Sequence, residues 1–175
     1  MPTDEPVLSR ELLLRAFARL DELLKTQSLT ADVFVFGGAA IVLGFDARPL
    51  TRDVDAVWKP HTAVLNAARD VADEFGMPRW WLNEQASVYL PAGAQSDGVP
   101  AFAGSALRVT TAKPELLLAM KVRAARTGDR EDIRLLASHL GLQSAVEILA
   151  LAESAFGAAV PDRQRLVVED LFAGF

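Results

Sequence analysis

FGGAAIVLGFDARPLTRDVD, residues 36–55, places a glycine pair after an apolar run and an Asp-Val-Asp sequence fifteen residues after the second glycine. Residues 33–36 are fully apolar and predict a short buried strand, and residues 39–45 predict a short helix that the glycines open. Residues 51–58 alternate in polarity and are rich in β-forming side chains, which predicts a second strand. The stretch therefore predicts a strand–helix–strand unit with glycines at one turn and carboxylates on the second strand.

The two carboxylates are predicted to share one face of the second strand. Side chains alternate along a strand, so Thr51, Asp53 and Asp55 point the same way. The Cα atoms of the two aspartates are then about 6.6 Å apart, which allows both carboxylates to reach one divalent ion or a pair of ions. Ligands that are all oxygen suit Mg²⁺ or Mn²⁺. The alternative is an exposed sheet face with two solvated aspartates, although like charges on one face repel each other.

The glycine pair fits one of three phosphate-binding patterns. A P-loop needs Gly-Lys-Ser/Thr, but Phe45 follows Gly44, and the segment lacks the G-x-G-x-x-G of a dinucleotide fingerprint. In the third pattern, backbone N–H groups at the start of a helix face phosphate oxygens, and the next strand carries the metal ligands. This pattern explains the spacing, because one segment binds a triphosphate and the other binds the metal that the phosphates bridge.

The rest of the chain predicts an α/β half followed by a helical half. Helices are predicted at residues 9–25, 62–75, 114–127, 130–140, 144–156 and 162–173, and short strands at 86–90, 101–102 and 107–110. A loop is predicted at residues 46–50. Elements become purely helical near Thr111, which predicts two regions, 1–110 and 111–175. We expect the helix at 114–127 to pack between them, because it is apolar almost all round.

Composition excludes several classes of protein. The chain has 175 residues, 51% of them hydrophobic, and a net charge of −5, which argues against a broad nucleic-acid-binding surface. It has no cysteine, so disulfides, thiolate nucleophiles and zinc–cysteine sites are excluded. The N-terminal MPTDEP lacks a signal-peptide pattern, and the longest apolar stretch, 33–45, is too short to cross a bilayer. These features predict a soluble cytoplasmic protein that does not contact membranes.

Two blocks of the sequence resemble a known family. GGAAIVLGFDARPLTRDVDAV is similar to the signature of the nucleotidyltransferase fold of the DNA polymerase β-like superfamily. PELLLAMKVRAARTGDREDIRLLASHLGL resembles the downstream block of small bacterial nucleotidyltransferase-like proteins, which are related to the AbiEii-type toxins of type IV toxin–antitoxin systems. WWLNE and VPDRQRLVVEDLF also look familiar and extend the resemblance over most of the chain.

The resemblance implies a minimal nucleotidyltransferase fold, in which a small mixed sheet with flanking helices precedes a helical C-terminal half. It also implies transfer of a nucleotide from an NTP to an acceptor, with Mg²⁺ or Mn²⁺ as cofactor. The acceptor would be tRNA, a protein or a small molecule, and a toxin role would bring a separately encoded antitoxin as partner. The family's motif residues correspond to Gly37, Gly38, Thr51, Asp53, Asp55, Lys121, Arg126, Asp129 and Asp132.

The resemblance further divides these residues by role. Asp53 and Asp55 would bind the metal. The nucleotide would be bound by Gly37, Gly38, Thr51, Lys121 and Arg126. The residues expected to be catalytic are Asp53, Asp55, Lys121 and Asp132.

Helical geometry adds an independent observation on Lys121. Apolar residues occupy the positions one turn before and one turn after it, and Asp132 lies beside two leucines in the first turn of the next helix. Two opposite charges are therefore predicted to face inward on consecutive helices. Two interpretations remain open and are compatible: a buried ion pair that locks the helix hairpin, and a lysine that contacts NTP phosphates while Asp132 orients it.

The sequence departs from the family where a general base is expected. Many polymerase-like transferases have a third carboxylate on a later strand, whereas ALRVTTA, residues 106–112, has none. Glu84 and Asp97 fall in predicted loops. The general base is therefore unassigned, or the chain uses the downstream lysine–aspartate pair. The departure also allows a non-catalytic module that binds a nucleotide or a partner protein.

Two further groups of residues have weaker signals. Trp80 and Trp81 are predicted to be core or pocket wall, with stacking on a base as the alternative. Arg126, Arg130 and Arg134 are spaced by four and would form a small RNA-contacting ridge on a continuous helix, which Gly128 is expected to break.

Overall fold

A computed structural model gives the fold of residues 7–45 and 48–174, and the chain divides into two compact units. Residues up to 88 and residues 98–112 make the first unit, and residues 89–97 and those from 113 onward make the second. The MPTDEP segment and residues 46–47 of the predicted loop lie outside the described residues.

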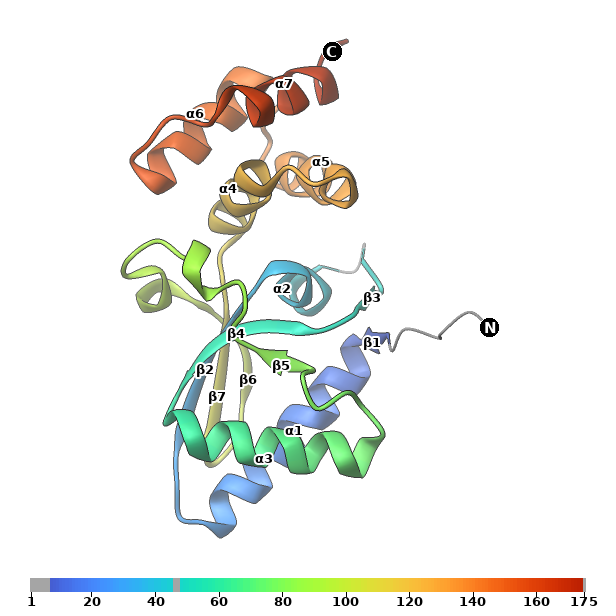
Figure 1. Ribbon diagram of the computed structural model, residues 1–175, viewed down its shortest axis with the longest axis vertical. Helices are drawn as coiled ribbons and strands as arrows, with labels where there is room; N and C mark the ends of the chain where they lie inside the picture. Colours follow the sequence, from blue (N-terminus) through green and yellow to red (C-terminus); the bar gives the residue numbers. More distant parts are fainter. Residues whose placement is uncertain (1–6, 46–47, 175) are drawn as a thin grey trace. The chain divides into compact units, whose positions relative to one another are not determined.

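The first unit is built on a five-stranded mixed sheet with the strand order β5-β4-β2-β7-β6 (Figure 1). These strands are β2 (Ala31–Phe36), β4 (Val54–Lys59), β5 (Leu82–Asn83), β6 (Val99–Ala103) and β7 (Leu107–Thr111). β2 is antiparallel to β4 and parallel to β7. A separate small sheet pairs β1 (Leu8–Ser9) with β3 (Leu50–Thr51).

Three α-helices accompany the sheet: α1 (Arg10–Thr26), α2 (Gly37–Gly44) and α3 (His61–Phe75). α1 begins at Ser9, whose hydroxyl accepts a hydrogen bond from the backbone of Leu12, and α3 ends at Gly76 in the left-handed conformation. α1 packs against α3 and β7, and α3 also packs against β4. α2 begins where β2 ends, so this helix starts at the edge where β4 begins (Figure 1).

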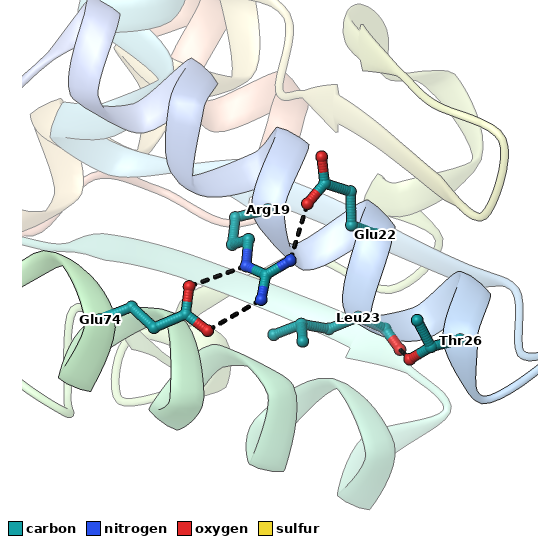
Figure 2. Close-up of polar contacts among 5 residues, drawn as sticks. All are labelled: Arg19, Glu22, Leu23, Thr26 and Glu74. Atoms are coloured by element: carbon teal, nitrogen blue, oxygen red, sulfur yellow. Dashed lines mark hydrogen bonds and ion pairs between the residues drawn. The ribbon is translucent and has the colours of Figure 1, made fainter.

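An exposed ion-pair network joins α1 to α3 (Figure 2). The Arg19 guanidinium donates two hydrogen bonds to Glu74, of 2.7 and 3.0 Å, and one of 2.7 Å to Glu22. The hydrogen bonds to Glu74 are the main reason that the pKa of Arg19 is raised. The paired groups are exposed, so the network aligns the two helices but adds little stability.

Asp21 joins α1 to the turn between β6 and β7. Its carboxylate accepts backbone hydrogen bonds of 2.6 Å from Ala106 and 2.7 Å from Leu107, and weaker ones from Ser105. Burial raises the pKa of Asp21, but these hydrogen bonds outweigh that effect and lower it below the ordinary value. The turn approaches so closely that a Cβ at Gly104 would overlap the Asp21 carboxylate and displace it from these hydrogen bonds.

The second unit is helical. It contains α4 (Pro114–Ala124), α5 (Arg130–His139), α6 (Ala145–Phe156) and α7 (Asp162–Leu171), with a 3₁₀ turn at Thr127–Asp129 before α5. α4 packs against the other three helices, which explains why it is apolar almost all round. Ser144 and Glu147 form a capping box at the start of α6.

Most predicted elements are confirmed, and two strand predictions are wrong. Residues 51–58 are not one strand, because β3 ends at Thr51 and pairs with β1, and β4 begins at Val54. Residues 86–90 hold a 3₁₀ turn, Ser87–Tyr89, and the nearby strand is β5, which the analysis of the sequence missed. The expected break near Gly128 is confirmed, so no continuous helix supports an arginine ridge.

Candidate functional site

Strand register brings Asp55 to the start of α2. Phe36, the last residue of β2, pairs with Asp55 near the beginning of antiparallel β4, and Gly37 follows directly. Gly37 has φ +65°, and a Cβ there would lie 2.9 Å from Asp55 Oδ2. A side chain at position 37 would strain the backbone and would also meet the carboxylate of half-buried Asp55, so two separate features favour glycine here.

Gly38 faces a second pair of polar side chains. A Cβ at this position would lie 3.1 Å from Thr51 Oγ1 and 3.2 Å from a terminal guanidinium nitrogen of Arg48. Arg48 also donates a hydrogen bond from Nε to the backbone oxygen of Leu50, at 3.2 Å. The start of α2 is thus flanked by a carboxylate, a hydroxyl and a guanidinium group.

Asp53 lies just before β4 and is held by two contacts. The Thr51 hydroxyl donates to the Asp53 backbone oxygen at 3.1 Å, and Asn83 Nδ2 donates to Asp53 Oδ2 at 3.0 Å. Asn83 is buried on β5, where its register partner is Asp55. The prediction that Thr51, Asp53 and Asp55 lie on one strand is wrong, because β3 ends at Thr51 and β4 begins at Val54. The side chains of Thr51 and Asp55 nevertheless both lie beside the glycines that open α2.

The residues at this edge fit Mg²⁺ or Mn²⁺. Both candidate donors are carboxylates, and the glycines leave free the space that side chains would fill beside Asp55 and Thr51. Within residues 7–45 and 48–174, no group of three or more His, Cys, Asp or Glu side chains could hold a metal ion. Two carboxylates suffice for Mg²⁺, which usually completes its shell with water and substrate phosphates.

The second group of predicted residues lies in the second unit. Lys121 Nζ on α4 donates to Asp129 Oδ1 at 2.6 Å and lies 3.0 Å from Asp132 Oδ2 on α5. The three side chains are only 16%, 10% and 7% exposed. Asp129 also accepts a hydrogen bond from the backbone of Arg126 at 3.0 Å. The predicted ion pair is therefore confirmed as a three-residue cluster with one ammonium group and two carboxylates.

The other acidic candidates are paired. Glu84 Oε2 lies 2.7 Å from His61 Nε2, and Asp97 forms an ion pair with Lys113 in the second unit. Trp81 is fully buried and donates from its indole nitrogen to the Ala68 oxygen at 2.9 Å, whereas Trp80 is 52% exposed. These contacts do not identify a general base.

Comparison with known families gives one result. Residues 11–165 match the family described as nucleotidyltransferase of unknown function (DUF6036). The match covers most of the chain, so the protein belongs to this nucleotidyltransferase family. Its mixed α/β architecture agrees with the nucleotidyltransferase fold. Neither the curated proteins nor the solved structures provide a match. In the described part of the chain, every helix is too short or too polar to span a membrane.

Arg48 and Asn83 are the site residues that the sequence analysis missed. Arg48 lies within residues 36–55, between the glycines and the aspartates, so its position in the sequence could have identified it as a site residue. Asn83 carried no such signal, because only the pairing of β5 with β4 brings it beside Asp53.

Proposed function

We propose that the protein transfers a nucleotide from an NTP to an acceptor at the edge formed by the start of α2 and the start of β4. The observation that carries the proposal is the contact of Asp55 with Gly37, which puts a carboxylate against the first residue of a helix. A helix start favours phosphate oxygens, and carboxylates beside it are ligands for the cation that accompanies a triphosphate.

The residues of the first unit have two proposed roles, metal binding and phosphate binding. Asp53 and Asp55 would hold Mg²⁺ or Mn²⁺, and Asn83 orients Asp53 through its side-chain amide. Backbone N–H groups of Gly37 and Gly38 and the Thr51 hydroxyl bind phosphate oxygens, while Arg48 neutralises their charge. When bound, the metal supplies electrostatic stabilisation of the charge that develops on the transferred phosphoryl group.

The proposed reaction is a substitution at the α-phosphorus of the NTP. The acceptor oxygen forms a bond to phosphorus, the bond to the bridging oxygen breaks, and pyrophosphate leaves. The acceptor hydroxyl loses its proton, and no side chain is assigned to take it.

Lys121, Arg126 and Asp132 belong to the proposal with separate roles. The contacts of Lys121 with Asp129 and Asp132 support a structural role. The family resemblance assigns Lys121 to NTP phosphates, with Asp132 orienting it. Arg126 is exposed and is assigned to the nucleotide by the family resemblance alone.

Calorimetric titration of MgATP and MgCTP into the wild type and Asp55→Asn tests the proposal. We expect the wild type to bind in a magnesium-dependent manner and the variant to lose this binding, because it lacks one ligand charge but keeps the side chain's shape. Glu169→Gln, which removes a negative charge from an exposed position on α7, is the control and should bind like the wild type. Equal affinity in the wild type and Asp55→Asn, or metal-independent binding, would refute the proposed metal site.

The second candidate function is a non-catalytic module with the same fold. The observation that favours it is the lack of a group of three acidic or metal-binding side chains in the described part of the chain. This module would bind an NTP, or a partner protein, without releasing pyrophosphate. Measuring pyrophosphate release with tRNA, cellular protein and small hydroxyl compounds as acceptors separates the two functions.

The toxin role is the most specific part of the proposed function. It rests on the resemblance of residues 114–142 to the downstream block of AbiEii-related proteins. A toxin that modifies a cellular acceptor should arrest growth when it is expressed alone, and the gene for its antitoxin should lie nearby. Arrest should disappear in Asp55→Asn, while growth that continues with active wild-type protein would contradict the toxin role.

A further inference from the structure

A pocket of about 590 Å³ opens in the first unit beside β5, outside the residues assigned to the NTP. The α3 wall consists of His61, Leu65 and Arg69, which are spaced by four residues and therefore lie on one helix face. The other lining residues come from the end of β4, from the segment before β5, from β5 itself and from the residue that follows it. They are Trp58, Arg79, Trp80, Leu82, Asn83 and Glu84.

Aromatic groups give the pocket flat surfaces. The Trp58 and His61 rings are stacked with their centroids 5.6 Å apart and an interplanar angle of 13°. Trp80 is 52% exposed, although the next residue, Trp81, is fully buried and fixes the backbone. Packing therefore does not account for a tryptophan at position 80, and its ring is available to a planar ligand.

Two guanidinium groups in the pocket differ in their partners. Arg79 donates two hydrogen bonds to Asp73, of 3.0 and 2.7 Å, so its charge is largely compensated. Arg69 is exposed and makes no ion pair with any residue in 7–45 or 48–174. Arg69 is thus the cation that can bind an anionic group of a ligand.

The pocket also has a carboxylate acceptor and shares a residue with the proposed metal edge. Glu84 Oε2 is paired with His61, whereas Glu84 Oε1 has no hydrogen-bond partner among the described residues. Asn83 lines the pocket and donates to Asp53. A ligand in the pocket therefore lies next to a residue that contacts Asp53, one of the two proposed metal ligands.

We propose that this pocket binds a nucleotide, with its base stacked on Trp80, an amino group of the base donating to Glu84, and its phosphate at Arg69. Aromatic stacking with an arginine at the phosphate is the usual chemistry of single-stranded nucleic-acid recognition. The nucleotide comes either from the 3′ end of an RNA acceptor or from a free mononucleotide. The role of this nucleotide as the acceptor rests on the proposed function. The binding of the nucleotide in the pocket does not depend on that function.

Equilibrium dialysis of AMP, CMP and adenosine in EDTA tests the pocket without the metal site. We expect Trp80→Ala to weaken mononucleotide binding about tenfold, and Trp80→Phe to retain most of it, because a phenyl ring still stacks. Tyr89→Ala, which removes an exposed aromatic side chain outside the pocket, is the control. Arg69→Gln should abolish the preference for AMP over adenosine, and Arg163→Gln, at an exposed position on α7, should not.

The same measurements in Asp55→Asn separate this proposal from the proposed function. Binding that persists in Asp55→Asn and in EDTA supports the pocket even if MgATP binding fails its own test. A short single-stranded RNA with a fluorescent base at its 3′ end distinguishes an RNA end from a free mononucleotide. A fluorescence change on binding to the wild type that is absent with Trp80→Ala supports the RNA end. Competition by AMP without any RNA response supports a free nucleotide. Affinities unchanged in Trp80→Ala and Arg69→Gln, or a wild type that binds none of the probes, would overturn the proposal.

Discussion

The carboxylates of the first unit and those of the second are held by different kinds of group. Asp129 and Asp132 surround the ammonium group of Lys121 and are nearly buried. Asp53 is held by a neutral amide, and Asp55 lies against a glycine at the start of a helix. The cluster around Lys121 compensates much of its charge internally. Asp53 and Asp55 lie half-buried at an edge of the first unit, where we propose that a cation binds. The difference separates a stabilising cluster from a candidate metal site.

The largest effect is expected for Lys121→Met, because it leaves two nearly buried carboxylates without their cation. The free energy of unfolding should fall by about 3 kcal/mol, which chemical denaturation would measure. Lys25→Met, at an exposed position on α1, is the control. Lys121→Met combined with Asp132→Asn should recover part of the loss, since one orphaned charge is removed.

Lys121→Met also tests the phosphate role of this residue. NTP affinity that falls in the folded variant supports a phosphate contact, and unchanged affinity limits Lys121 to stability. If both stability and affinity match the wild type, the description of the cluster is wrong.

Asn83→Ala should act on the first unit through metal-dependent binding. The loss of the amide that orients Asp53 should weaken magnesium-dependent NTP affinity about 10–100-fold, the usual effect of removing a partner of a metal ligand. Asn66→Ala, at an exposed position on α3, is the matched control. Calorimetry with and without Mg²⁺ measures this effect, and a loss that is equal in both conditions would argue against a positioning role.

Asp21→Ala should cost about 1–2 kcal/mol of stability at neutral pH, because a carboxylate that accepts backbone hydrogen bonds is lost. The pKa of Asp21 is lowered in the fold from an ordinary value of 3.8, so its contribution is present above about pH 4. It is lost as pH falls through the lowered pKa. Thermal unfolding of the wild type and Asp21→Ala should therefore converge at acidic pH. Asp70→Ala, at an exposed position on α3, is the control and should have little effect on stability at neutral pH. If the difference in melting temperature between the wild type and Asp21→Ala stayed constant down to acidic pH, the Asp21 carboxylate would be excluded as its cause.

The smallest effect is expected for Glu74→Gln. The variant breaks the exposed contact between Glu74 and Arg19, and exposed ion pairs contribute little to stability (Figure 2). The melting temperature should remain close to that of the wild type and should depend little on salt. A large decrease would mean that charge pairing at the surface matters as much as it does around Lys121.

Local sequence pattern predicted most helices and the two turns that carry the glycines and aspartates. The periodic residues of α1 and α3 and the break after α4 identified those helices. Pattern failed where short segments depend on distant partners: β3 is a strand only because it pairs with β1, and β5 because it pairs with β4. The same cause explains the site, in which Gly37 and Asp55 were predicted together but Asn83 was not. Asp129 was expected as a motif residue, and packing of α4 on α5 makes it a second partner of Lys121.

The central claim is that the aspartates of the first unit, rather than those of the second, hold the catalytic metal. Anomalous diffraction from crystals grown with Mn²⁺ and a non-hydrolysable NTP analogue tests it most directly. The account predicts a manganese peak about 2.1 Å from carboxylate oxygens of Asp53 and Asp55, with the analogue's phosphates on the same ion. A peak at Asp129 and Asp132, or a manganese ion bound by the analogue without contact to Asp53 or Asp55, would contradict it.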